Sequence, residues 1–328
     1  MKKIFYSLFV VFILAGCKKE KTSTNTATPS STANVVTFSI SDFGLTSGSL
    51  STNGINATTA LKDQIKYLQY AKGKYPEPGF YNDFESFKTK QFAATDPNFG
   101  LIKDSVPDGH SNFSFVGSDV PGEISVKTIP LSGGNRYYRP TFSLDYKLLT
   151  SNMYAANIDT TLTGMPINKP VIMHRMVSKV TIHLNDAIPA NAAKFILTFV
   201  DYPTSLDLVS IRGLDRGRRD DFYPDASFEF PITANYIGKK GVELCSIVFP
   251  YSYPEISLQC LDAKGNIIAK KVLPKNFENV YNDIAPNTQY KFTGNFFAQS
   301  ANFNITVDTK WNSPVNIPFA LPGSTQRL

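Results

Sequence analysis

Residue types that usually carry catalysis or metal binding are scarce in this chain of 328 residues. It contains three cysteines, three histidines and one tryptophan. His110, His174 and His183 are scattered, and no Cys/His spacing typical of a metal site is present. The sequence also lacks a phosphate-binding glycine loop and a Gly-x-Ser-x-Gly motif. We therefore expect no enzymatic activity, no metal and no cofactor.

Charge is also limited, which narrows the class of partner. Charged residues make up 18% of the chain, and the formal net charge of +6 is spread along it. Such a mild and dispersed charge does not favour nucleic acid as a partner. Aromatic residues reach 13%, and together with abundant Thr, Ser and Asn they favour β-structure over helix bundles.

The first seventeen residues have the order of a secretory signal peptide. Met1-Lys2-Lys3 is basic, and the apolar run that follows to Ile13 is too short to span a bilayer. The run ends in Leu14-Ala15-Gly16-Cys17, which resembles a bacterial lipobox. We therefore expect residues 1–16 to be removed and lipid, including palmitate, to be attached to Cys17. The segment 17–34 has no large apolar residue and is predicted to be a disordered tether.

Alternation of apolar and polar residues dominates the rest of the chain. It is clearest in segments 36–40, 142–148, 179–184 and 303–311, and each predicts a strand with one buried face. Many short strands separated by turn residues predict an all-β fold built from β-sandwiches. Segment 58–73 is ambiguous, because Leu61, Ile65 and Leu68 have helical spacing although residues 64–70 also fit a strand.

A turn-rich passage at 163–170 lies between predicted strands in the middle of the chain. Since the chain is long enough for two domains of ordinary size, we expect an N-terminal domain at 35–168 and a C-terminal domain at 169–328.

Cys245 and Cys260 lie on either side of the turn residues 249–254. A regular hairpin would place them opposite each other, and export would permit oxidation. The sequence therefore predicts a cross-strand disulfide, with two buried free thiols as the alternative.

Three segments together resemble fimbrillin-type proteins of Bacteroidetes-type bacteria. One is VIMHRMVSKVTIHL at 171–184, a strand with a central arginine. The second is an acidic-x-x-Pro-x-Gly element ending at Gly109, followed by Phe113-Ser114-Phe115. The third is FNITVDTKWNSPVNIPF at 303–319.

The resemblance implies two tandem transthyretin-like β-sandwich domains and a place in surface filaments, the fimbria or pili used in cell adhesion. In this family, stalk subunits are cut, typically after an arginine, and lose their first strand. A strand from a neighbouring subunit then fills the vacated groove by β-augmentation. Anchor subunits keep their lipid and their first strand.

The candidate first strand here is 35–43, and no arginine precedes Arg136. Lysines at 62, 66 and 72 leave cleavage by a lysine-specific protease open. We therefore expect an anchor-like or accessory fimbrial lipoprotein at the outer membrane. Its expected partners are membrane lipid, through Cys17, and other fimbrial subunits. An alternating apolar set near the C-terminus is a possible strand-exchange segment or an edge strand of its own domain: Val315, Ile317, Phe319 and Leu321.

Two further features concern carbohydrate. The triplets around Ser105 and Thr160 resemble the O-glycosylation sites of the phylum in which this family is common. The alternative function is a surface lipoprotein that binds glycan without catalytic activity. That function requires exposed aromatic platforms, and the single tryptophan, Trp311, is expected to lie in the core instead.

Overall fold

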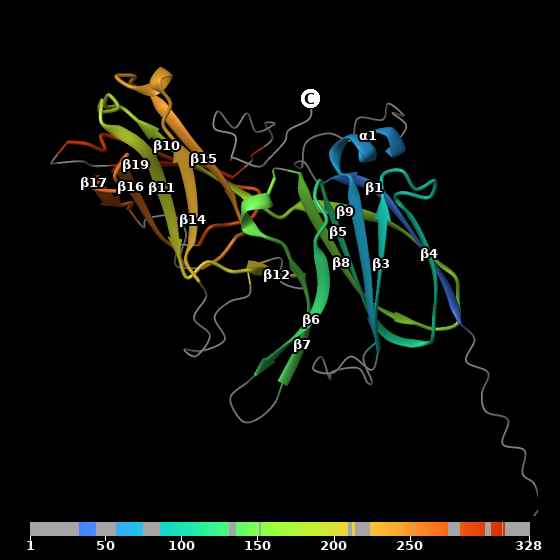
Figure 1. Cartoon of the computed structure of the whole chain (residues 1–328). Coiled ribbons are helices and arrows are strands. Elements are labelled where there is room, and N and C mark those ends of the chain that lie inside the picture. Colours follow the sequence, from blue (N-terminus) through green and yellow to red (C-terminus); the bar gives the residue numbers. More distant parts are fainter. Residues whose placement is uncertain are drawn as a thin grey trace, which may run out of the picture.

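The computed structural model describes residues 33–43, 57–74, 86–130, 136–150, 152–208, 212–213, 224–252, 254–274, 283–298, 303–309 and 311. The signal peptide, Cys17, the tether up to residue 32 and the segment with Val315, Ile317, Phe319 and Leu321 lie outside them. Strands are the main secondary structure of the described chain and only one short α-helix is present in it, which confirms the predicted all-β fold (Figure 1).

The first half of the chain builds a seven-stranded sheet with the order β3-β2-β5-β8-β9-β1-β4. Neighbouring strands are antiparallel, except for β1 and β9, which are parallel. A short helix, α1 (Ala57–Gln64), precedes β2. The strands are β1 (Asn34–Phe43), β2 (Tyr67–Lys74), β3 (Ser86–Ala93), β4 (Leu101–Val106), β5 (Gly109–Ser118), β8 (Met153–Leu162) and β9 (Ile167–Arg175).

This sheet folds over into two layers between β8 and β9. The two strands pair only at Tyr154↔Arg175 and Ala155↔His174. Beyond this short contact, β4-β1-β9 form one layer and β3-β2-β5-β8 form the other. One core cluster contains buried side chains from both layers, as expected for a β-sandwich.

The second half contains two four-stranded sheets, β15-β10-β18-β19 and β14-β11-β16-β17. Buried side chains from both sheets belong to one large core cluster. The strands are β10 (Ser178–Leu184), β11 (Ala192–Val200), β14 (Ala226–Pro231), β15 (Val242–Val248), β16 (Glu255–Asp262), β17 (Ile267–Val272), β18 (Gln289–Gly294) and β19 (Phe303–Asp308), with a 3-10 turn η2 (Ala234–Tyr236).

A small fourth sheet connects the two halves. Its order is β13-β12-β7-β6, from β6 (Glu123–Pro130), β7 (Arg136–Ser143), β12 (Ser205–Asp207) and β13 (Arg212–Gly213). β7 belongs to the first half of the chain and β12 to the second, and they pair through three residue pairs. The hairpin of β6 and β7 extends beyond β12 (Figure 1). The two halves therefore share backbone hydrogen bonds.

The ambiguous segment 58–73 contains both structures that its sequence allowed. Helix α1 ends at Gln64, and β2 begins at Tyr67. The strand predicted over 142–148 is wrong in its second part, because β7 ends at Ser143 and Tyr146–Leu148 form the 3-10 turn η1. Asp145 accepts a hydrogen bond from the Lys147 backbone N–H at 3.0 Å, which starts that turn.

The expected domain boundary between residues 168 and 169 lies inside β9. Because β9 belongs to the seven-stranded sheet and β10 to a sheet of the second half, the chain passes between them at residues 176–177.

The hairpin expected between Cys245 and Cys260 is absent, which corrects the basis of the predicted disulfide. Cys245 lies on β15 and Cys260 on β16, which belong to different sheets. Both are buried free cysteines. The residues between these strands cross from one sheet to the other, with Phe249 fully buried and its backbone N–H donating to Tyr202 Oη at 2.6 Å.

Candidate functional site

The first strand, β1, occupies a slot between two other strands. Six residue pairs join it to β4 in antiparallel register, from Asn34↔Val106 to Ser39↔Leu101. Seven pairs join it to β9 in parallel register, from Val36↔Ile167 to Phe43↔Met173. Because both edges of β1 are paired, removing it would leave two unpaired edges facing each other. The predicted first strand at 35–43 is thus confirmed as an integral part of the sandwich.

The inward face of β1 carries Val36, Phe38 and Ile40, which are 0%, 1% and 6% exposed. Burial of each such side chain contributes roughly 1.5–3 kcal/mol. The centroid of the Phe38 ring lies 4.9 Å from the ring centroid of Phe113 and 5.1 Å from that of Phe115. Both partners are on β5 in the opposite layer. Phe38 therefore fills the aromatic centre of the sandwich and fixes the register of β1.

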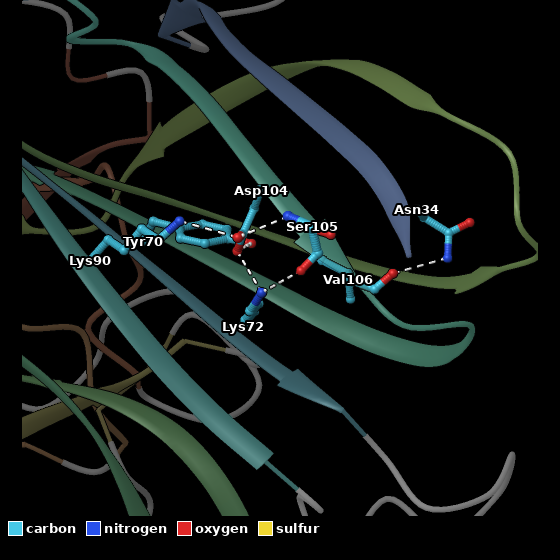
Figure 2. A network of polar contacts seen from close by, with 7 residues as sticks. All are labelled: Asn34, Tyr70, Lys72, Lys90, Asp104, Ser105 and Val106. Carbon is cyan, nitrogen blue, oxygen red and sulfur yellow. Dashed lines mark hydrogen bonds and ion pairs between the residues drawn. The ribbon is translucent and has the colours of Figure 1, made fainter. Parts of the chain in front are cut away.

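The beginning of β1 is held by the side chain of Asn34, which is 1% exposed. Its Nδ2 donates to the Val106 carbonyl at 3.0 Å and to Asp108 Oδ1 at 2.7 Å. Figure 2 shows the first of these bonds at the end of β4. The residue at which the chain enters the fold is thus attached to the neighbouring strand by side chain as well as backbone.

Asp104 on β4 forms a polar cluster with β2 and β3, which lie in the opposite layer (Figure 2). Its carboxylate lies 2.7 Å from Lys72 Nζ and 3.1 Å from Lys90 Nζ. Tyr70 Oη donates to it at 3.2 Å, and the Ser105 backbone N–H at 2.9 Å. The cluster therefore bridges the two outer edges of the seven-stranded sheet and closes one side of the sandwich.

Charge and burial act together on the titratable groups of this cluster. Partial burial alone would raise the pKa of Asp104, but hydrogen bonds from Lys72 and Lys90 outweigh it and hold the pKa below its ordinary value. Burial, and then the negative charge of Asp104, raise the pKa of Tyr70. At neutral pH the carboxylate is therefore ionised and the phenol keeps its proton to donate.

A second polar cluster lies where β9 leads into the second half. The side chain of Arg175, the last residue of β9, is 6% exposed. Its guanidinium donates to the Trp311 carbonyl, to Tyr154 Oη at 3.3 Å and to Asn287 Oδ1 at 3.4 Å. It also stacks on the Trp311 ring at 4.6 Å. Arg175 thus joins the seven-stranded sheet to segments of the second half.

The predicted modification sites are on separate strands. Ser105 is exposed on β4, directly beside the Asp104 cluster. Thr160 is half-buried on β8, opposite Ser111 of β5. The structure does not bring these two residues together, and glycosylation at either remains a prediction.

Sequence reasoning missed both polar clusters, although each left a visible signal. Val171, Met173 and Arg175 alternate along β9 and share its buried face. Likewise Asp104 lies between Ile102 and Val106 on one face of β4. A charged residue within the apolar set of an alternating strand requires buried partners, and this requirement points to such clusters.

The described residues contain neither a candidate metal cluster nor a helix that could span a membrane. No group of three or more His, Cys, Asp or Glu side chains in this part of the chain could hold a metal ion. Within the same residues, no helix has the length and apolar character needed to cross a membrane.

The chain was compared with known proteins. No protein-family model and no curated protein matches it. Solved structures that resemble it include the fimbrial anchor protein Mfa2 from Porphyromonas gingivalis, with 12% identity and a TM-score of 0.46. This match covers 84% of the present chain and 98% of the other.

A second similar structure is the tip fimbrial protein Mfa3 from the same organism, with 9% identity and a TM-score of 0.45. It covers 84% of the present chain and 99% of the C-terminally truncated Mfa3 chain. Both of these structures are fimbrial proteins, the class of protein that the three sequence segments resemble. At these values of identity and TM-score, the roles of the neighbours are not transferred to this chain.

Proposed function

We propose that this protein is a lipid-anchored outer-membrane protein of the cell surface that acts as an anchor-like or accessory subunit in filament assembly. It remains attached through Cys17 and keeps its own first strand. Other subunits then bind to it through strand-mediated contacts.

The integration of β1 carries this proposal. β1 is paired along both edges and places Phe38 in the aromatic core. A polymerising subunit of the kind described above has to lose this strand, whereas an anchor has to retain it. The lipobox at Cys17 precedes β1 in the sequence, so retention of β1 keeps the folded domains connected to the lipid.

The positions of possible cleavage sites also favour retention. No arginine lies between β1 and Arg136 on β7. Lys72 is in the middle of β2, paired on both sides, and its side chain is only 15% exposed. Lys66 is exposed between α1 and β2 and is the more accessible lysine. A protease needs an extended and accessible segment, so few sites allow removal of β1.

The single tryptophan does not provide the exposed aromatic surface that the glycan-binding alternative requires. Trp311, the single tryptophan, is 1% exposed and is covered by Arg175. A sugar ring cannot stack on it in this arrangement. No other observation among the described residues favours glycan binding.

The proposed function is tested by determining the N-terminal residue of the mature protein and whether it carries lipid. Intact-mass and peptide analysis would be made on the outer-membrane fraction and on material sheared from the cell surface. We expect lipidated Cys17 and a chain containing β1 in the membrane fraction, and loss of membrane attachment in Cys17→Ser. An N-terminus beyond Phe43 in the sheared fraction would instead identify a polymerising subunit.

A further inference from the structure

β1 begins at the end of the seven-stranded sheet that is remote from the second half, at the lower right of Figure 1. Its neighbour β9 runs parallel to it and ends at Arg175, from where the chain enters β10 of the second half. The N-terminus of β1 and the C-terminus of β9 therefore leave the strand pair at opposite ends.

We propose that β1 is a mechanical clamp that carries tension between the membrane and the second half of the protein. This inference rests on the proposed function, because only a chain attached to the membrane upstream of β1 is loaded in this way. It adds a load-bearing function that retention of the strand alone does not require.

The direction of the load decides how the hydrogen bonds between β1 and β9 resist it. Tension pulls β1 from its N-terminus and β9 from its C-terminus. In a parallel pair this force runs along both strands, so all seven residue pairs resist sliding at the same time. If the strands were instead peeled apart from one end, the pairs would break one after another. Forced unfolding is governed by the unfolding barrier, and simultaneous loading gives the higher barrier.

Side chains oppose the same sliding motion. Phe38 would have to leave its contacts with Phe113 and Phe115 before β1 could move along β9. A shift of one residue would also turn the buried face of β1 outward. The irregular register between Ile40 and Asp42 adds a fixed point, because a bulge pairs in only one alignment.

The other neighbour, β4, reinforces the entry point. Asn34 Nδ2 is bonded to the Val106 carbonyl and to Asp108. Asp104, two residues before Val106, holds β4 to Lys72 and Lys90 of the opposite layer. Load that reaches β4 through Asn34 is therefore distributed to β2 and β3.

The test is single-molecule force spectroscopy on the chain from residue 18 to 328, which retains every described residue. Both proteins carry one handle at the N-terminus. The second handle is attached to Asn185→Cys for the lengthwise pull, or to Pro107→Cys for the peeling pull. Both positions are exposed, whereas Cys245 and Cys260 are buried. Residue 185 is reached covalently from β9 through β10, and residue 107 directly follows β4.

We expect the first unfolding event to need at least about twice the force in the lengthwise pull as in the peeling pull. The reason is that the unfolding barrier depends on the direction of pulling. The released length should match extraction of β1. Equal forces in the two geometries, or a first event elsewhere in the chain, would overturn the clamp.

Two variants probe the residues that carry the clamp. Phe38→Ala should lower the lengthwise force, and Val35→Ala, on the exposed face of the same strand, should leave it unchanged. If Phe38→Ala does not fold, Asn34→Ala supplies the same comparison through the entry bonds. If Phe38→Ala, or Asn34→Ala in its place, unfolds at the same lengthwise force as Val35→Ala, the proposal is contradicted. The measurement needs no lipid, so an unlipidated N-terminus in cells would refute the proposed function without altering this result.

Discussion

The guanidinium carbon of Arg175 lies 4.6 Å from the centroid of the Trp311 ring, so a cation at the end of β9 is stacked on an aromatic side chain from the other end of the sequence. Both residues are buried, at 6% and 1% exposure. The hydrogen-bond acceptors that Arg175 contacts in the described part of the chain are neutral oxygens of Tyr154, Asn287 and Trp311. A buried cation needs such compensation, so the two halves are coupled at this point.

Replacement of Arg175 by Ala should therefore be strongly destabilising. It removes a desolvated cation–π contact and several charged hydrogen bonds, and we expect a loss of about 2–4 kcal/mol in the free energy of unfolding. Arg175→Lys should recover only part of this loss, because an ammonium group lacks the planar fork. Urea unfolding followed by fluorescence measures both variants, and Trp311, the single tryptophan, reports directly on the contact.

Lys147 provides the matched control for this measurement. It lies over the Tyr146 ring at 5.7 Å but is exposed. Lys147→Ala should cost no more than about 1 kcal/mol. Equal losses for the alanine variants of Arg175 and Lys147 would show that Arg175 does not couple the halves.

Phe38→Ala should reveal how firmly β1 is bound in its slot. The substitution leaves a cavity between Phe113 and Phe115, and we expect a loss of about 3–5 kcal/mol. Val35→Ala on the same strand should change stability by no more than about 0.5 kcal/mol, because Val35 is 54% exposed. Denaturant unfolding gives both values, and limited proteolysis should cut the Phe38 variant faster at the start of the fold. A small effect at Phe38 would mean that β1 contributes little to the sandwich.

Local periodicity predicted the strands whose two faces differ in burial. β1 and β10 follow their alternating residues, because side chains of a strand point to opposite faces in turn. Segment 58–73 contains a helix followed by a strand, so both interpretations of its apolar spacing had a basis. The alternation at 142–148 was misleading where Asp145 starts a 3-10 turn.

Strand partners and polar clusters could not be predicted, because they depend on residues far apart in the sequence. Cys245 and Cys260 have hairpin spacing, yet the buried Phe249 and its bond to Tyr202 take the chain into the other sheet. The partners of Asp104 lie on β2 and β3, and nothing local identifies them. Only the unusual positions of Asp104 and Arg175 on apolar strand faces could be seen beforehand.

Cys245 and Cys260 should remain reduced thiols in the folded protein, even under oxidising conditions. They lie on strands of different sheets, and burial raises the pKa of both, to about 11 for Cys260. A buried thiol with a raised pKa reacts slowly. Alkylation followed by mass spectrometry should label neither residue in the native state and both in denaturant without reductant. A peptide containing a bond between the two cysteines would contradict the assignment of both as free thiols.

The Asp104 cluster should give stability that depends on pH in one direction. The pKa of the Asp104 carboxyl group in the folded state is below the ordinary value of 3.8. The contribution of this group to stability is therefore present above that value and is lost as the pH falls through the folded-state pKa. Asp104→Asn should therefore cost about 1–3 kcal/mol at pH 7, and this difference from the wild type should shrink below about pH 4.

The surface pair of Lys194 and Glu229, exposed by 36% and 57%, gives the control. Glu229→Gln should change stability by no more than about 1 kcal/mol. Urea unfolding of both variants between pH 3 and 7 makes the comparison. A loss at Asp104 that stays constant across this range would mean that the side chain acts through packing rather than charge.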